Sequence, residues 1–290
     1  MKKNSGSENL SPNRIAFRKF RKNKLAMFGL IVIVVLIVVS IAAPVLTPYD
    51  RDKIDMYSME APPSSEHLLG TDEIGRDVLT RLLYGGRVSL AVGILASLAE
   101  IVIGVVLGAV AGFYGGKVDA VIMRITDVIM CFPFFVVAIV LAAIVGPSMV
   151  NLIFIIAILE WTKIARIVRA EVLSLKERDF ITASRSMGLN EFEIILRHIL
   201  PNTFASIMVF ATLAIANGIL TEAALSFLGM GVRPPQPSWG NMLAAAQSMR
   251  VLQYEWWLWI PQGFMVFITV ISINFLGDGL RDALDPRLKK

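Results

Sequence analysis

Long apolar runs constrain the fold of this chain more than any other feature of its sequence. Several of them approach the roughly 20 residues that an α-helix needs to cross a hydrocarbon core of about 30 Å. Of the 290 residues, 56% are hydrophobic and only 18% are charged, whereas soluble domains carry charge on about a quarter of their residues. The sequence therefore predicts an all-α, polytopic membrane protein.

We expect six membrane-spanning helices. They cover residues 25–43, 88–113, 118–145, 149–159 with a basic continuation to 169, 204–228 and 257–276. Pro133 should bend the third helix, because proline lacks the backbone N–H and clashes with the preceding turn. Residues 72–84 are predicted to form an amphipathic helix that lies at the membrane surface or on its neighbours, with Asp77, Thr80 and Arg81 on its polar face.

The distribution of basic residues predicts the orientation. Six spans place both termini on one side, and 21 of the 28 Lys and Arg residues then lie on that side. By the positive-inside rule this side is the cytoplasm. The domain limits that follow are a cytoplasmic tail (1–24), a first span with an external segment (25–87), a main transmembrane domain (88–278) and a second cytoplasmic tail (279–290).

A polar, basic segment interrupts the apolar runs at residues 171–202. Residues 171–187 have helical composition, and Gly188 is placed as a helix stop. Asn190 should cap a second helix, with Glu193 completing a capping box, and Pro201 should end that helix before the fifth span. The apolar side of the second helix, which includes Phe192, is compatible with two interpretations: it packs on the spans of its own chain, or it docks on a soluble partner.

A few polar residues lie inside the expected spans. Glu100 lies about halfway along the second span, and a carboxylate there is a candidate for a translocation pathway, as are Asn217 and Glu222 in the fifth. The alternative for Glu100 is that it is protonated or pairs with a polar group on a neighbouring subunit, and the alternative for Asn217 and Glu222 is hydrogen bonding between helices. Gly104, Gly108 and Gly112 form one smooth helix face suited to close helix packing, within the chain in preference to between subunits.

Charged pairs at helical spacing suggest local ion pairs. Glu160 should pair with Lys163, and Arg124 with Asp127, because residues three apart share a helix face.

Several classes of function have no support in the sequence. There is no Gly-x-x-x-x-Gly-Lys-Ser/Thr motif to bind a nucleotide phosphate, and no constellation of catalytic residues. The single cysteine and two histidines offer no metal-binding cluster. The net charge of +5 is explained by membrane orientation and does not call for nucleic acid. We expect a protein without catalytic residues, cofactor or metal.

The segment 171–202 resembles the coupling loop (EAA loop) of importer-type ABC permeases. The family's Glu-Ala-Ala falls on Thr182-Ala183-Ser184 and its Gly on Gly188, and the string around its Leu-Pro reads Arg197-His198-Ile-Leu200-Pro201-Asn202. Thr182 replaces the glutamate of the family and Ser184 an alanine, so one charge of the motif is missing.

Other strings extend the resemblance along most of the chain, to the C-type permease subunit of dipeptide/oligopeptide and nickel ABC importers. They are Leu69-Gly-Thr-Asp-Glu-Ile-Gly-Arg-Asp77, Gly85-Gly-Arg-Val-Ser89, Tyr114-Gly-Gly-Lys-Val-Asp119, Ser226-Phe-Leu-Gly-Met-Gly-Val-Arg-Pro-Pro-Gln-Pro-Ser-Trp-Gly240 and Gly277-Asp-Gly-Leu-Arg-Asp-Ala-Leu-Asp-Pro-Arg287.

The resemblance implies a type I ABC importer transmembrane domain in a bacterial or archaeal plasma (inner) membrane. It implies a second, homologous permease, two ABC ATPase subunits that bind ATP and Mg²⁺, and an extracytoplasmic substrate-binding protein as partners. Peptide is the expected substrate and nickel the alternative within the family. An ion-coupled secondary transporter and a purely structural subunit are the alternatives outside it.

Overall fold

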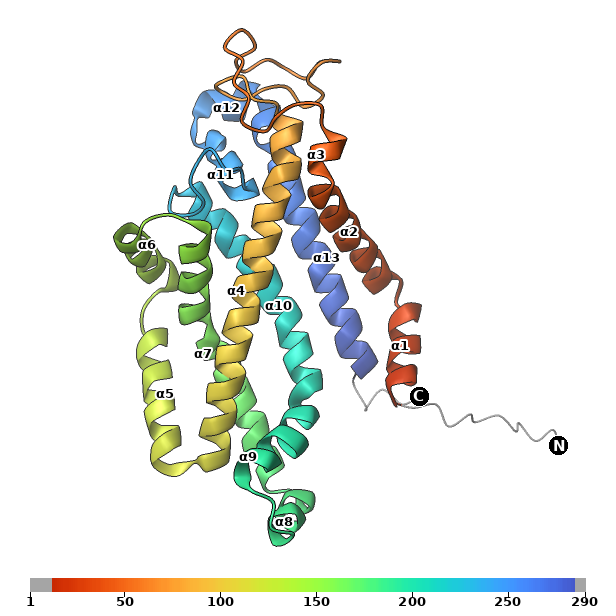
Figure 1. The fold of residues 1–290 in the computed structure, drawn as a ribbon, viewed down its shortest axis with the longest axis vertical. Coiled ribbons are helices and arrows are strands. Elements are labelled where there is room, and N and C mark those ends of the chain that lie inside the picture. Colours follow the sequence, from red (N-terminus) through yellow and green to blue (C-terminus); the bar gives the residue numbers. More distant parts are fainter. Residues whose placement is uncertain (1–11, 285–290) are drawn as a thin grey trace, which may run out of the picture.

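The computed structural model describes residues 12–284, with side chains from residue 17 onward, and every regular element in this part of the chain is a helix (Figure 1). Four helices are long and apolar enough to cross a membrane: α2 (Lys24–Ile41), α4 (Val78–Tyr114), the run Glu191–Phe227 that includes α10 (Leu200–Phe227), and α13 (Ile260–Leu284). The predicted all-α membrane fold is confirmed.

The two remaining predicted spans have less regular counterparts. α5 (Gly116–Met130) and α6 (Phe134–Val145) pass the same test only as a pair, bent by 87°. Pro133 lies in the break, as expected, because it cannot donate the hydrogen bond that would continue the helix. α7 (Met149–Lys176) is continuous but apolar in its first half only, since six charged residues lie between Glu160 and Lys176, both included.

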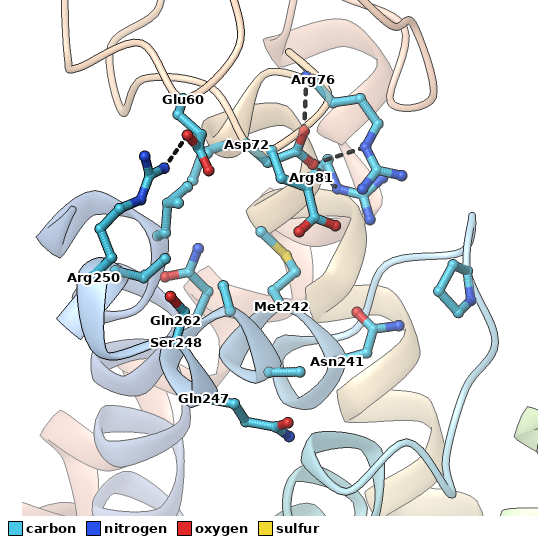
Figure 2. A pocket seen from close by; sticks show the side chains of 17 residues that line it. Glu60, Asp72, Arg76, Arg81, Asn241, Met242, Gln247, Ser248, Arg250 and Gln262 are labelled. Carbon is cyan, nitrogen blue, oxygen red and sulfur yellow. Dashed lines mark hydrogen bonds and ion pairs between the residues drawn. The ribbon is translucent and has the colours of Figure 1, made fainter.

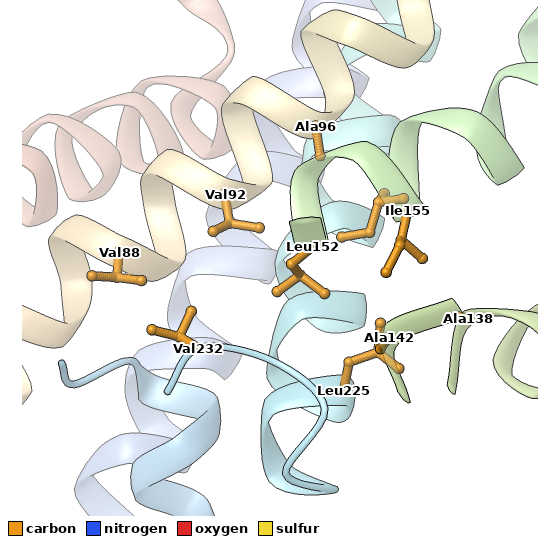
Figure 3. Close-up of a cluster of buried hydrophobic side chains, with 10 residues drawn as sticks. Val88, Val92, Ala96, Ala138, Ala142, Leu152, Ile155, Leu225 and Val232 are labelled. Atoms are coloured by element: carbon orange, nitrogen blue, oxygen red, sulfur yellow. The ribbon is translucent and has the colours of Figure 1, made fainter. Parts of the chain in front are cut away.

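α4 lies at the centre of the bundle, against α7, α10 and α2, while α13 packs on α2 and α10 (Figure 1). One apolar cluster joins four helices at the half of the bundle near α6 (Figure 3); its labelled members are Val88, Val92, Ala96, Ala138, Ala142, Leu152, Ile155, Leu225 and Val232. Lipid is as apolar as these side chains, so such contacts stabilise the bundle through close packing and not through removal from water.

The helix predicted for residues 72–84 is wrong in its bounds, because it is not a separate helix, but its residues do lie on neighbouring parts of the chain, one of the two predicted positions. Residues 72–77 form a turn around the carboxylate of Asp72, and the residues after them are the first turns of α4. Thr80 and Arg81, predicted to face solvent, are 0% and 4% exposed. The guanidinium of Arg81 donates to the carbonyls of Arg51 and Pro235, which cover this end of α4 from distant parts of the sequence.

Short helices fill the two ends of the bundle. At the end where α4 begins lie α3 (Ala43–Leu46), α11 (Trp239–Leu243), η2 (Ala244–Gln247), α12 (Met249–Tyr254) and η3 (Trp256–Leu258), with the loop of residues 47–77 above them. At the opposite end lie α8 (Asp179–Ser186), α9 (Glu191–Ile194) and the π-helical turn η1 (Ile195–Ile199).

The predicted tails are partly helical. α1 (Pro12–Lys22) occupies most of the described part of the first tail, and α13 runs on to Leu284, beyond the predicted limit of the transmembrane domain at residue 278. The rest of both tails, with their basic residues, and the end of the Gly277–Arg287 string lie outside the described residues.

Candidate functional site

The helix–Gly–helix segment protrudes from one end of the bundle (Figure 1). We call residues 179–199, which comprise α8, α9 and η1, the knuckle. Gly188 connects α8 to α9 with φ +82°, a left-handed conformation that glycine adopts without strain. The Leu189 N–H donates to the carbonyl of Ser184, and the Gly188 N–H to that of Arg185, which ends α8 in the manner of a glycine-capped helix.

The cap of the second helix is simpler than expected. The side chain of Asn190 accepts a hydrogen bond from the N–H of Glu193, at 2.8 Å. The reciprocal half of the predicted capping box does not form, because the carboxylate of Glu193 turns away to pair with Arg197 one helical turn later, at 2.7 Å.

The second helix does not end at Pro201, contrary to the prediction. It continues through η1 into α10 as one helical run from Glu191 to Phe227. The π turn accommodates the proline, since the N–H of Leu200 bonds to the carbonyl of Ile195, five residues back. The side chain of Asn202 supplies a donor to the carbonyl of His198. The knuckle and the fifth span are therefore mechanically continuous.

The knuckle has a buried and an exposed apolar face, so both interpretations of its apolar residues apply. Ile181, Ile194 and Ile199 are 0% exposed and pack with residues of α4 and α7. On the other face Met187 is 71% exposed and Phe192 67% exposed. Phe192 was predicted on the same apolar side as Ile194 and Ile199, but it lies on the exposed face instead.

The predicted coupling residues divide between these faces. Thr182, Ala183, Gly188, Pro201 and Asn202 are exposed. Ser184 is buried, with its hydroxyl donating to the carbonyl of Phe180, and His198 and Leu200 are half-buried. A Cβ added to Gly188 would meet no atom within 4 Å. The exposed set therefore lies on an open surface.

A cavity of about 210 Å³ lies between α4, α7 and α10 and brings together two of the three predicted pathway residues. Glu100, 5% exposed, lines it from α4 and Asn217 lines it from α10. Glu160 and Lys163 of α7 line it too, and they form the expected ion pair. From the sequence, Lys163 was predicted only as the ion-pair partner of Glu160, and Thr221 was not singled out; the signal for Thr221 is its position one helical turn after Asn217.

Glu222 does not line this cavity. Its side chain is 0% exposed and its two carboxylate oxygens accept hydrogen bonds from Ser89 and Ser226, each at 2.7 Å. The hydroxyl of Ser89 also accepts the N–H of Trp239, at 3.0 Å. Glu222 thus ties α10 to α4 and α11.

The three glycines of α4 face α7. A Cβ on Gly104 would lie 2.8 Å from the carbonyl oxygen of Trp161, and one on Gly108 would lie 2.5 Å from that of Ala165. A Cβ on Gly112 would lie 2.9 Å from the carbonyl oxygen of Arg169. The two helices approach so closely that only hydrogen fits at these positions.

The predicted pair of Arg124 with Asp127 is wrong. Asp127 pairs instead with Arg166 of α7, and Asp119 makes a bidentate pair with Arg169. Tertiary packing offers α5 these partners on a neighbouring helix, so Asp127 bonds to Arg166 of α7 and not to a residue of its own helix.

The comparisons with known proteins agree with the resemblance. Residues 104–290 match the family described as the binding-protein-dependent transport system inner membrane component. Residues 11–63 match the N-terminal TM domain of oligopeptide transport permease C.

Similar proteins align along nearly the whole chain. The dipeptide transport system permease protein of Alkalihalophilus pseudofirmus is 44% identical over 280 residues, which cover 97% of this chain and 91% of that protein. The oligopeptide transport system permease protein of Bacillus subtilis is 40% identical over 284 residues, 98% of this chain and 92% of that protein. The glutathione transport system permease protein of Pectobacterium atrosepticum is 43% identical over 280 residues, which cover 96% of this chain and 92% of that protein.

A solved structure supports the fold. The inward-facing MetNI methionine ABC transporter contains a chain that matches 71% of this one, over 97% of its own length, with a TM-score of 0.54 and 19% identity. The expected resemblance to C-type peptide permeases is confirmed, and the chain belongs to the family of binding-protein-dependent transport system inner membrane components.

Proposed function

We propose that this chain is the non-catalytic, membrane-spanning permease subunit of an ATP-driven importer of di- and oligopeptides. Two separate ATPase subunits bind ATP and Mg²⁺, a second homologous permease completes the pathway, and a substrate-binding protein delivers the peptide from outside. The observation that carries the proposal is the knuckle, a helix–Gly–helix projection with exposed apolar side chains such as Met187 and Phe192. Such a surface suits a groove on a soluble partner.

The knuckle and both termini lie in the cytoplasm in this proposal, since the positive-inside rule places the basic majority there. The end of the bundle with α11 and α12 then faces outward. The names of the relatives support peptide as the substrate, because they transport dipeptides, oligopeptides and glutathione.

The cavity that contains Glu100 lies on the pathway. Asn217 is exposed on α10, in line with the exposed Leu213 and Leu220. The exposed face of α2 is purely apolar, from Leu25 to Ile41, as a lipid contact requires. Polar groups within a membrane face the protein interior or a water-filled space, so the α7–α10 face borders the pathway and the second permease.

The knuckle transmits movement because both of its arms lead to this cavity. α8 follows directly on α7, which carries Glu160 and Lys163, and α9 continues through η1 into α10, which carries Asn217. When ATP closes the ATPase subunits, a displacement of the knuckle moves two walls of the cavity together. The two states must differ in their affinity for the closed ATPases, otherwise ATP could not shift the equilibrium between them.

Replacing Gly188 by valine tests this coupling. A β-branched side chain at φ +82° is strained by about 1–3 kcal/mol, while the surface around it is open, so the change distorts the turn and leaves the bundle intact. Reconstituted transporter should still hydrolyse ATP and should lose peptide uptake.

Gly115→Val is the matched control. Gly115 lies at the same end of the bundle, has φ +67° and is equally open, but it connects α4 to α5 outside the knuckle. Normal uptake in the Gly188 variant would rule out the coupling role.

A panel of labelled di-, tri- and pentapeptides and Ni²⁺, offered to cells with and without this gene, tests the substrate. Loss of Ni²⁺ uptake alone would identify nickel, and not peptide, as the substrate.

A further inference from the structure

Three arginines at the end of the bundle opposite the knuckle are paired with acids. They line a cavity of about 660 Å³ between the loop before α4 and helices α11 to α13 (Figure 2). Arg76 and Arg81 pair with Asp72, and Arg250 pairs with Glu60. The positive charges in this cavity are therefore neutralised from within the protein.

Arg87 of α4, near the same end, has no acidic partner. Its Nε donates to the carbonyl of Ser40, at 2.6 Å, and its Nη2 donates to that of Ile41. Among the residues that the structure describes, no carboxylate lies within ion-pair distance of its guanidinium. Nη1 makes no hydrogen bond to a described residue and is not among the buried unpaired atoms, so it is accessible from outside. The two carbonyls orient the guanidinium but do not balance its charge.

The guanidinium of Arg87 lies where the hydrocarbon core of a membrane ends. α2 has 18 residues and, at about 1.5 Å per residue, is about 27 Å long, close to the thickness of a hydrocarbon core. Ser40 and Ile41 are its last two residues. Their carbonyls, and the guanidinium bonded to them, are therefore at the level of the lipid head groups.

An apolar groove of about 490 Å³ runs from Arg87 toward the middle of the membrane, between α2 and α4. Ile41 and Ile94 at its edges are 66% and 40% exposed, so the groove is open to lipid. Ser40 and Arg87 contribute only carbon atoms to its walls. From Arg87 to Ile94 it extends about 10 Å along α4. The residues that line it are Ile37, Ser40, Ile41, Arg87, Leu90, Ala91 and Ile94.

We propose that this groove holds an acyl chain of a phospholipid whose phosphate accepts hydrogen bonds from the guanidinium of Arg87. Phosphate matches the planar fork of an arginine in charge and geometry, and Nη1 is free to donate. Because no acid balances Arg87, the site prefers a lipid with net negative charge, such as phosphatidylglycerol, to zwitterionic phosphatidylcholine. The bound lipid fills the seam between α2 and α4.

A helix of another subunit fits this groove less well than a lipid. Helices in lipid pack closely through small residues, whereas Val38 and Leu95, which follow two of the lining residues in sequence, are large and about half exposed. A protein helix with apolar side chains would also leave the charge of Arg87 unbalanced at the level where lipid phosphates lie.

Native mass spectrometry of the purified full chain, and of the assembled transporter, tests the proposal by titration with phosphatidylglycerol and phosphatidylcholine. Ala91→Phe places a ring in the groove and should remove the tightest-bound phosphatidylglycerol. Leu98→Phe is the matched control, because Leu98 is an exposed residue of α4 that does not line the groove.

Arg87→Gln should weaken the binding of phosphatidylglycerol roughly tenfold, since a hydrogen bond to a charged group is lost, and should abolish the preference over phosphatidylcholine. Arg87→Lys should retain that preference. Arg124→Gln removes an exposed positive charge of α5 far along the chain from the groove and should change neither.

Equal lipid binding in wild type and the Ala91 variant, or an unchanged preference in Arg87→Gln, overturns the proposal. So does dissociation of the second permease from the Ala91 variant with unchanged lipid binding, which would show that a protein helix fills the groove. These measurements on the single chain do not involve transport, so their result is independent of the function proposed above.

Discussion

Replacing Gly108 by alanine should weaken the contact between α4 and α7. The added Cβ would lie 2.5 Å from the carbonyl oxygen of Ala165 and 3.0 Å from both the Cα of Ala165 and the Cβ of Val168. Ala165 presents backbone atoms, which cannot rotate away as the end of a long side chain could. The two helices must therefore move apart, and contacts along their whole interface lengthen.

The magnitude follows from two opposing terms. Overpacking of this kind costs about 1–3 kcal/mol, whereas alanine in place of glycine stabilises a helix by roughly 0.5–1 kcal/mol. Gly263→Ala carries only the second term, because a Cβ at this position of α13 meets only Leu243 Cδ2, at 3.8 Å, so the difference between the two variants gives the cost of overpacking. Both variants share the gain in helix propensity, so the Gly108 variant should be less stable than the Gly263 variant by about 1–3 kcal/mol.

Unfolding of the purified chain in mixed micelles by increasing SDS, followed by tryptophan fluorescence, measures this difference. Trp161 is buried on α7 beside this contact and is one of the five tryptophans that contribute to the signal. If both variants unfold at the same SDS fraction, the glycine face does not hold α4 to α7. Loss of assembly with unchanged stability of the single chain would assign the face to a contact between subunits.

Three further variants test other contacts. Glu222→Leu should prevent stable folding, because it leaves the hydroxyls of two buried serines without an acceptor. Glu222→Gln should keep fold and uptake, and a stable Leu variant in the SDS assay would contradict the hydrogen-bonded role. Glu100→Gln should reduce the rate of peptide uptake and leave ATP-driven closure and stability intact, and an unchanged rate would remove it from the pathway. Arg169→Met should cost about 1 kcal/mol, less at high salt, because its bidentate pair with Asp119 is partly exposed; an effect that is independent of salt would show that packing, not charge, holds α5.

Local sequence determined the helices and their breaks. Runs of about 20 apolar residues can only be helical in lipid, because every backbone hydrogen bond must be made within the segment. Pro133 and Gly188 act through their own backbone chemistry, so the bend between α5 and α6 and the turn between α8 and α9 could be placed from sequence alone. The ion pair of Glu160 with Lys163 is local too and was predicted on the same basis.

Partners from distant parts of the chain could not be assigned in this way. Asp127 bonds to α7, Arg81 is covered by the loop before α4 and by Pro235, and Glu222 meets Ser89, 133 residues away in the sequence. Pro201 was predicted to end a helix, but the helix continues because the π turn of η1 accommodates the proline.

The candidate sites divide along the same line. The knuckle was visible in sequence because its polarity and its Gly turn are local. The cavity that contains Glu100 and the groove beside Arg87 are not, since each lies between helices whose contacts are set only when the helices pack. Sequence alone therefore determined the long apolar helices and the breaks at Pro133 and Gly188, because these depend on local chemistry. Tertiary structure decided whether a helix continues past Pro201, which polar groups find partners and which are left free for a ligand.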